Sequence, residues 1–236
     1  MFLTVSPYLL ILLLFLLVVM VISVKKRKLT LDASFTAAMI GMIVLHSAHF
    51  KGLAMLMTFF LLSLFATAHK RTIKKKLHPD NRADKGRNSG QVLANGGIAG
   101  LTGLLSSIDP QHRELYLIMM AASLASALAD TLSSELGMVY GRRYFNILSL
   151  KKDANGLDGV VSIEGLLIGA AGSGLIAFIF SGFNQVSLIV FAAGIVGNLS
   201  DSILGAALER KRWIGNNAVN FLNTLIAALF ALLIRN

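Results

Sequence analysis

The sequence contains no cysteine, and only 14% of its 236 residues are charged. Without cysteine there can be no disulfide framework, no thiolate metal site and no cysteine nucleophile. The charged fraction lies well below the roughly 25% typical of soluble domains, whereas hydrophobic residues make up 55% and the mean hydropathy is +0.70. No hydrophilic stretch is long enough for a separate soluble domain. We therefore expect one membrane-embedded domain over residues 1–236.

Acidic residues are scarce as well, with 12 Asp and Glu against 22 Lys and Arg, which gives a formal net charge of +10. A basic excess is typical of nucleic-acid-binding proteins, but this chain has almost no soluble surface to offer. Cationic loops that stay in the cytosol and face anionic lipid explain the excess better. The sequence therefore predicts the lipid bilayer, and no nucleic acid, as its surroundings.

The apolar runs predict an all-α, polytopic transmembrane bundle of about eight spans. Their approximate ranges are 7–24, 31–48, 52–69, 91–108, 114–136, 162–182, 186–208 and 218–234. Basic residues follow the first run, and no small-residue cleavage site does, so we interpret it as a retained helix and not as a signal peptide. Glycines crowd the run at 91–108, which is therefore expected to be broken or re-entrant.

The loop charges predict the orientation of these spans. Four loops on one side of the membrane hold 19 of the 22 Lys and Arg residues, and Lys51, Arg113 and Arg235 remain for the other side. The positive-inside rule then places both termini outside. The four cytosolic loops are 25–28, 70–87, 141–161 and 209–217.

Carboxylates interrupt two of the apolar runs. Asp130 and Glu135 lie in one run, and Asp201 and Glu209 lie in another. A charged side chain at the centre of a bilayer costs about 2.5–3.5 kcal/mol on insertion scales, so these four residues are expected to have a function. Oxygen ligands without clustered His or Cys favour Mg²⁺ over Zn²⁺. The alternative is that each Asp is only hydrogen-bonded to a neighbouring helix.

The stretch 87–97, RNSGQVLANGG, combines a cation, amides and glycines at the start of a span. A helix N-terminus rich in glycine exposes backbone N–H groups that suit phosphate, with Arg87 and Asn95 close by. The alternative is a glycine-rich packing surface, because 96–100 also reads as GxxxG.

Two further polar stretches flank the last three spans. DANGLDG at 153–159 contains strong turn-forming pairs, and either a turn alone or a turn with ligand contacts fits it. At the start of the last span, Asn216, Asn220 and Asn223 share one helical face. A face with three amides is not suited to lipid, so we expect it to point into the bundle.

Five stretches together resemble an integral-membrane family that includes the plant phytyl-phosphate kinase of vitamin E synthesis. They are RNSGQVLANGG at 87–97, ADTLSSELG at 129–137, DGVVS at 158–162, GNLSDSILGA at 197–206 and NNAVNFLNT at 216–224. The resemblance covers about 85–236, the expected catalytic core, whereas the three spans within 1–70 match only in hydropathy. It implies CTP-dependent transfer of a phosphoryl group to an isoprenyl monophosphate, which gives the diphosphate.

The motifs and the chemistry of their residues define a candidate site. We assign catalytic roles to Asp130, Asp201 and Arg87, and magnesium binding to Asp130, Glu135, Asp201 and Glu209. Phosphoryl transfer needs positioning and charge neutralisation more than covalent chemistry, so the absence of an evident base is consistent with this assignment. The expected substrate-binding or nucleotide-binding residues are Asn95, Gly96, Ser134, Asp158, Ser162, Asn198, Asn216, Asn217 and Asn220.

Two other functions remain open from the residues. A transporter could use Asp130 and Asp201 as a coupling-ion site, although the crowding of polar residues on one side favours an enzyme. A cytidylyltransferase would transfer CMP to a lipid phosphate and release pyrophosphate. We expect a prokaryotic cytoplasmic membrane, because the chain begins almost directly with a span, and a site that faces the cytosol. The motifs leave the prenyl chain length and the oligomeric state open.

Overall fold

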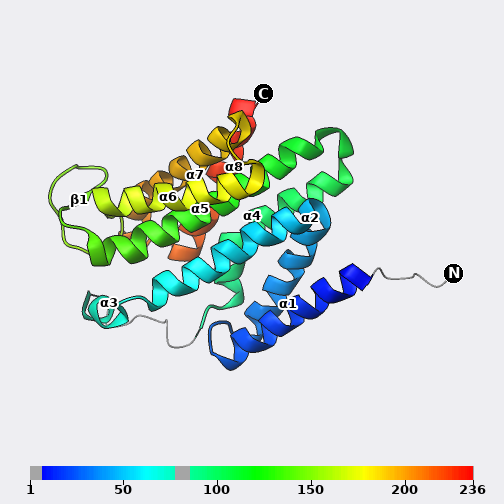
Figure 1. Cartoon of the computed structure of the whole chain (residues 1–236). Helices are drawn as coiled ribbons and strands as arrows, with labels where there is room; N and C mark the ends of the chain where they lie inside the picture. Colours follow the sequence, from blue (N-terminus) through cyan, green and yellow to red (C-terminus); the bar gives the residue numbers. More distant parts are fainter. Residues whose placement is uncertain (1–6, 78–85, 236) are drawn as a thin grey trace.

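The computed structural model describes residues 7–77 and 86–235, with side chains from residue 14 onward. The chain forms an all-α bundle, as expected, with a small β-hairpin that the sequence did not predict (Figure 1). The helices are α1 (Pro7–Lys25), α2 (Leu31–Ala68), α3 (Arg71–Leu77), α4 (Ser89–Ile108), the 3₁₀ turn η2 (Pro110–His112), α5 (Arg113–Tyr140), α6 (Ile163–Ser181), α7 (Gln185–Leu204), the π turn η3 (Gly205–Glu209) and α8 (Asn216–Arg235). The antiparallel strands are β1 (Tyr144–Asn146) and β2 (Val160–Ser162).

Five helices in the described part of the chain are long and apolar enough to cross a membrane. They are Leu31–Ala68, Pro110–Tyr140, Ile163–Ser181, Gln185–Glu209 and Asn216–Arg235. The first of them, α2, has 38 residues and is kinked at His49, whose backbone is not helical (φ 52°, ψ −140°). Figure 1 shows its two halves running in different directions. A helical membrane bundle is therefore confirmed, whereas eight spans and their orientation stay predictions.

The break expected within 91–108 is absent. α4 is one continuous helix, and a capping box between Asn88 and Gln91 closes its first turn. Its glycines serve close packing instead, since Gly96 and Gly100 lie against Ile40 of α2. Small residues on a helix face let two helix backbones approach, so glycine here strengthens a helix–helix contact without breaking the helix.

α5 lies at the centre of the bundle and packs against α2, α4, α6, α7 and α8. Its buried face is rich in small side chains, among them Ala121, Ala125 and Ala129, which are fully buried. Such residues allow close helix approach on several sides at once. Asp130 is the next residue of α5 after Ala129, and it is half-buried between the helices.

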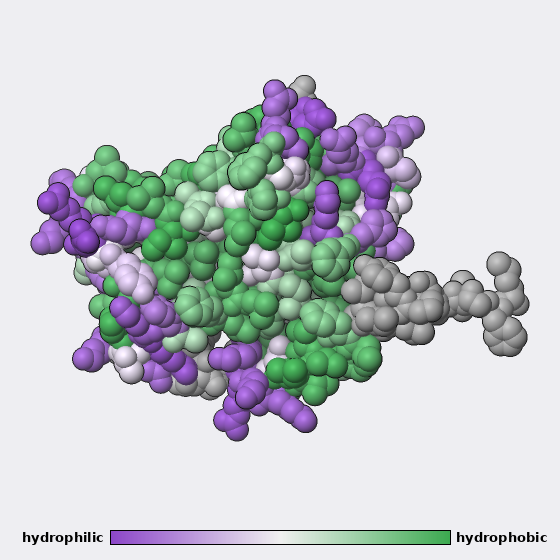
Figure 2. Space-filling view, in the orientation of Figure 1, coloured by the Kyte–Doolittle hydropathy of each residue, from purple (hydrophilic) through white to green (hydrophobic). Residues whose placement is uncertain are grey.

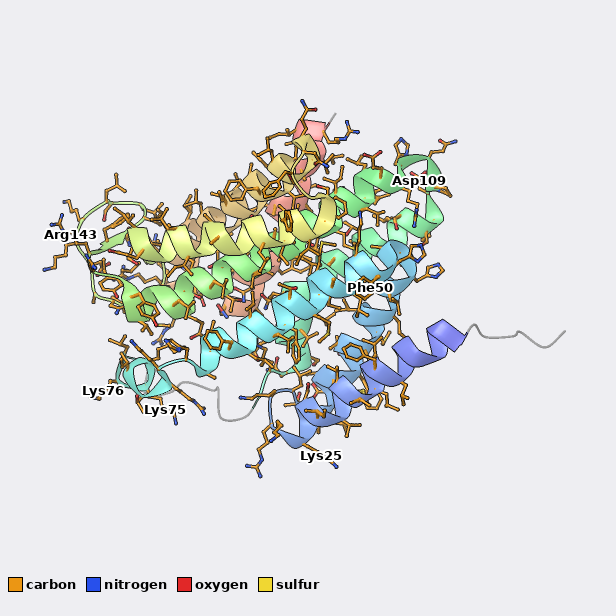
Figure 3. The ribbon with its side chains drawn as sticks, viewed as in Figure 1. Lys25, Phe50, Lys75, Lys76, Asp109 and Arg143 are labelled. Atoms are coloured by element: carbon orange, nitrogen blue, oxygen red, sulfur yellow. The ribbon has the colours of Figure 1, made fainter. Side chains whose placement is uncertain are left out.

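The surface separates into an apolar middle and charged ends. Figure 2 shows hydrophobic residues over the middle of the visible face and hydrophilic residues gathered at its ends. In Figure 3, one end of the bundle carries Lys25, Lys75, Lys76 and Arg143, and the opposite end carries Phe50 and Asp109. A bilayer-spanning protein needs this distribution, because only the apolar band can face hydrocarbon.

Candidate functional site

Two polar cavities lie among the helix ends, at the end of the bundle that carries Lys25, Lys75, Lys76 and Arg143. The cationic cavity, of about 260 Å³, is lined by Arg27, Lys28, Arg71 and Arg87 among other residues. The acidic cavity, of about 230 Å³, is lined by Asp130, Asp158, Asp201 and Glu209 among other residues. Three residues line both cavities, namely Asp130, Ser134 and Asn216. The cavities therefore adjoin at the C-terminal half of α5.

Arg87 reaches the cationic cavity because its backbone is tied to the linker between α1 and α2. Its N–H donates to the carbonyl of Lys28 (2.9 Å), and its carbonyl accepts from the N–H of Thr30 (3.0 Å). Gly86 makes this approach possible, since its φ is +74° and a Cβ there would lie 2.9 Å from the carbonyl oxygen of Arg27. Arg27 and Lys28 were predicted only as charges of a cytosolic loop, and they now lie beside Arg87 in the cavity lining.

The guanidinium of Arg87 stays a cation in this setting. Desolvation lowers its pKa from the ordinary value, and the nearby Glu135 carboxylate acts in the opposite direction. Arginine remains protonated over such shifts, and its planar fork suits phosphate oxygens. The cavity can therefore hold a phosphate group close to Arg87.

Glu135 has a partner of its own on the side of the cationic cavity. The buried Lys74 donates to Glu135 Oε2 at 2.5 Å and to the carbonyls of Ala66 and Thr67 at 2.7 and 3.0 Å. These three bonds fasten α3 to α2 and α5. Glu135 lines the cationic cavity and not the acidic one, so the structure separates it from Asp201 and Glu209.

Asp130 of α5 and Asp201 of α7 line the acidic cavity together, close enough for their carboxyl groups to interact. The Nδ2 of Asn223 on α8 donates to Asp201 Oδ1 at 2.7 Å, and its Oδ1 accepts from Ser126 Oγ at 2.8 Å. Two carboxylates so close repel each other unless a proton or a cation lies between them. Of the three amides expected to point into the bundle, Asn223 is fully buried, Asn220 is half-buried at the cationic cavity, and Asn216 is exposed where the two cavities meet.

The β-hairpin closes the acidic cavity against η3. Gly159 adopts φ +71°, and a Cβ there would collide with Ala206, so only glycine fits. Beside this contact, Arg210 Nη1 donates to Asp153 Oδ2 at 2.6 Å, and this bond lowers the pKa of the Asp153 carboxyl. Single π turns often occur at functional sites, and η3 ends with Glu209, which lines the cavity.

Most residues expected at the site line one of the two cavities. The cationic cavity includes Arg87, Asn95, Asp130, Ser134, Glu135, Asn216 and Asn220. The acidic cavity includes Asp130, Ser134, Asp158, Ser162, Asn198, Asp201, Glu209 and Asn216. Gly96 lines a neighbouring apolar pocket, and Asn217, which approaches the backbone of Gly90, is absent from both linings.

The carboxylates do not form a four-ligand metal cage. Within the described ranges, no group of three or more His, Asp or Glu side chains is arranged to hold a metal ion. Asp130, which lines both cavities, nevertheless lies close to Asp201, which lines the acidic cavity. Mg²⁺ is usually held by one or two carboxylates, with waters and substrate phosphates as its other ligands. The donor set of this pair therefore suits a magnesium ion whose remaining ligands are waters or phosphate oxygens.

Comparison with known proteins gives one family and several relatives. The family model described as "Integral membrane protein DUF92" matches residues 14–228. "Uncharacterized membrane protein MJ0933" of Methanocaldococcus jannaschii is 32% identical over 213 residues, which cover 89% of this chain and 87% of that protein. "Uncharacterized membrane protein sll0875" of Synechocystis is 30% identical over 203 residues, 83% and 78% of the two chains. "Protein VTE6, chloroplastic" of Arabidopsis thaliana is 26% identical over 218 residues, which cover 87% of this chain and 65% of that protein. No solved structure matches the chain.

Proposed function

Since the chain belongs to the integral membrane protein family DUF92, we propose that it is a membrane kinase. It would transfer a phosphoryl group from a nucleoside triphosphate to an isoprenyl monophosphate and give the isoprenyl diphosphate. The family resemblance implies that the nucleotide is CTP. The observation that carries this proposal is the meeting of two cavities of opposite charge at Asp130. The family motifs and the plant chloroplast relative agree with it.

Each cavity suits one substrate. The cationic cavity would take the phosphate of the acceptor, because Arg87 and its neighbours can bind phosphate oxygens through charge-assisted hydrogen bonds. The acidic cavity would take the triphosphate, with Asp130 and Asp201 as the residues that hold magnesium. That ion would neutralise charge on the transferring group. Ser134 and Asn216, at the shared wall, would orient the two phosphates toward each other.

The proposed transfer needs no strong base. A phosphate monoester is already an anion at neutral pH, so its oxygen can attack the terminal phosphorus of the nucleotide directly. The bond from that phosphorus to its bridging oxygen breaks, and the nucleoside diphosphate leaves. Lys74, the lysine beside Glu135, is held in three hydrogen bonds and has no role as a base here.

We also propose the eight-span topology with both termini outside. The kink at His49 divides α2 into two segments, each of which we count as one span. The other six of the eight proposed spans are α1, α4, α5, α6, α7 and α8. The two cavities lie at the end that carries the cationic loops, which supports a site open to the cytosol. The archaeal and cyanobacterial relatives support a prokaryotic cytoplasmic membrane.

Product analysis of the purified protein tests the kinase against the two alternatives. The protein in lipid nanodiscs is supplied with CTP, Mg²⁺ and phytyl, geranylgeranyl or farnesyl monophosphate. Release of CDP with formation of the prenyl diphosphate is the expected result. Release of pyrophosphate would identify a cytidylyltransferase instead. Absence of any nucleotide product, together with cation flux in proteoliposomes that Asp130→Asn abolishes, would identify a transporter.

A further inference from the structure

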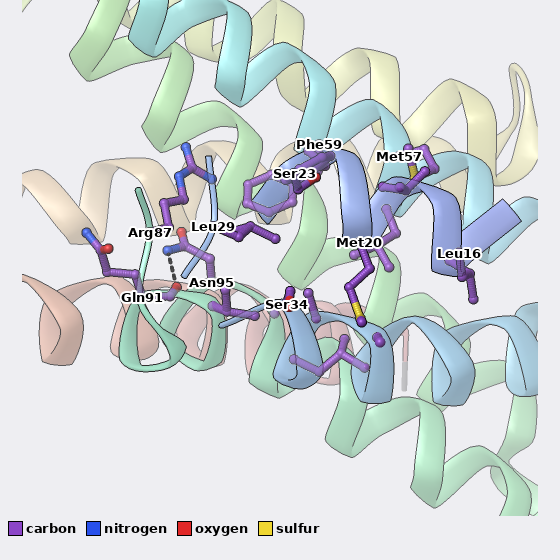
Figure 4. Close-up of a pocket in the computed structure, with 18 residues that line it drawn as sticks. Leu16, Met20, Ser23, Leu29, Ser34, Met57, Phe59, Arg87, Gln91 and Asn95 are labelled. Carbon is purple, nitrogen blue, oxygen red and sulfur yellow. Dashed lines mark hydrogen bonds between the residues drawn. The ribbon is translucent and has the colours of Figure 1, made fainter. Parts of the chain in front are cut away.

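An apolar pocket of about 90 Å³ lies between α1, α2 and α4 (Figure 4). Arg87, Gln91 and Asn95 line this pocket and the cationic cavity alike. The two spaces therefore adjoin along one face of the start of α4. A ligand that occupies both would have a charged end among the cations and an apolar end among the helices.

α1 forms the outer wall of this pocket. Leu16, Val19, Met20 and Ser23 line it at helical spacing, whereas Leu17, Val18, Val21 and Ile22 of the same helix are exposed. The exposed side of an apolar helix in a membrane protein faces lipid. α1 thus separates the pocket from the bilayer, and a lipid would reach the pocket beside it.

The lining changes from polar to apolar along the pocket. Figure 4 shows Arg87, Gln91 and Asn95 at one end, Ser23 and Phe59 between, and Met57, Met20 and Leu16 toward the other end. Methionine side chains are flexible and polarizable, so they adapt to irregular apolar ligands. A hydrocarbon chain with methyl branches is such a ligand.

We propose that this pocket binds the isoprenyl chain of the acceptor while its phosphate lies in the cationic cavity. The phosphate end of this assignment rests on the proposed function. The chain would pass Arg87 and Asn95 and continue between Met20 of α1 and Met57 of α2. This assigns substrate binding to the N-terminal helices, which carry none of the family motifs quoted above.

Photo-crosslinking tests the position of the chain without relying on catalysis. The probe is farnesyl monophosphate with a diazirine at the end of its chain, added to the full-length protein in phosphatidylcholine nanodiscs. We expect crosslinked peptides from α1 and α2, and competition by phytyl monophosphate but not by phosphatidic acid. Crosslinks that map to α6, α7 or α8 would overturn the assignment. So would equal competition by phosphatidic acid, because the pocket would then take a diacyl lipid.

A pocket-filling substitution gives a second test. Ala38→Phe places a ring in the pocket, whereas Ala170→Phe adds the same ring to α6, on a half-buried alanine that is absent from the pocket lining. We expect Ala38→Phe to weaken crosslinking and raise the KM for phytyl monophosphate about 10-fold or more, the scale of a lost fit in a hydrophobic pocket. The KM for CTP should not change, and Ala170→Phe should match the unmodified protein. Equal effects of the two variants would contradict the proposal.

The pocket and the kinase can fail separately. If no diphosphate forms but the probe still crosslinks to α1 and α2 in competition with phytyl monophosphate, the kinase is wrong and the lipid site stands. If diphosphate forms but the crosslinks map to other helices, the kinase stands and the assignment of the pocket is wrong.

Discussion

Asp130 and Asp201 are the residues on which the proposed chemistry depends most directly. Asn223 is fully buried, and its Nδ2 donates a hydrogen bond to Asp201. The Oδ1 of the same Asn223 accepts a hydrogen bond from Ser126. A buried amide with both ends bonded has little freedom to turn, so the carboxyl of Asp201 is held toward Asp130. This chain of bonds gives the pair a defined geometry before any ligand arrives.

Replacing either Asp with Asn should separate folding from activity. We expect Asp130→Asn and Asp201→Asn to insert and fold, because an amide costs less in lipid than a carboxylate. Prenyl diphosphate formation should fall by about 100-fold or more, the scale lost when one electrostatic stabiliser is removed. Turnover and thermal unfolding of the purified variants measure both effects. Normal turnover in both variants would exclude the carboxylate pair from the reaction.

Two glutamates offer a matched comparison at the same scale. Glu209→Gln removes a carboxylate from the acidic cavity and should raise the Mg²⁺ concentration needed for half-maximal rate. Glu135→Gln leaves the buried Lys74 without its ion-pair partner and should lower stability by about 3 kcal/mol. Its Mg²⁺ dependence should stay unchanged, because Glu135 lies on the cationic side. A shifted Mg²⁺ curve for Glu135→Gln would restore it as a metal ligand.

Among the elements, the β-hairpin and η3 act together as the outer wall of the acidic cavity. The register of the hairpin, with Phe145 opposite Val161, places the loop that contains Asp158 over η3. The contact between Gly159 and Ala206 then sets how closely the two elements approach. Nucleotide binding should therefore depend on a glycine that carries no functional group.

A pair of glycine substitutions isolates this contact. Gly159 and Gly182 both have positive φ (71° and 72°), but only a Cβ at Gly159 would meet a neighbour within 4 Å. Alanine at either position should lower stability by about 1–3 kcal/mol, because side chains rarely adopt a backbone conformation with positive φ. Only Gly159→Ala should also push the hairpin away from η3 and raise the KM for CTP. Kinetics of both variants check this, and an equal KM would show that the contact is not needed.

The sequence predicted the helices well where hydropathy marked them. It predicted poorly those features that depend on contacts between residues far apart in the chain. Asp130 and Asp201 were expected to belong to one magnesium site, and α5 and α7 bring them together in the wall of the acidic cavity. The bridge between Leu29 and Arg87 joins residues far apart in the chain, so no local pattern could reveal it. α1 is uniformly apolar, and no periodicity marks which of its faces lines a pocket. The glycines of α4 indicated a break because their packing partner on α2 was not visible in the sequence.

At the scale of the whole molecule, the topology can be tested directly. The chain has no cysteine, so single cysteines can be introduced without a background. Lys152→Cys and Lys211→Cys should react with a membrane-impermeant maleimide only from the cytosolic side, and Lys51→Cys only from outside. The unmodified chain is the control. Labelling of position 152 from outside alone would reverse the proposed orientation of both cavities.

The two backbone hydrogen bonds that tie Arg87 to the linker after α1 have a further consequence. A movement of α1 that opened the pocket to lipid would also move the linker and, through the linker, Arg87. On the proposed function, the arrival of a chain in the pocket would then be coupled to the position of the phosphate-binding residue. A nucleotide bound alone would find no prepared partner for its terminal phosphate. The arrangement would protect the cell from idle hydrolysis of nucleotide when the acceptor is scarce.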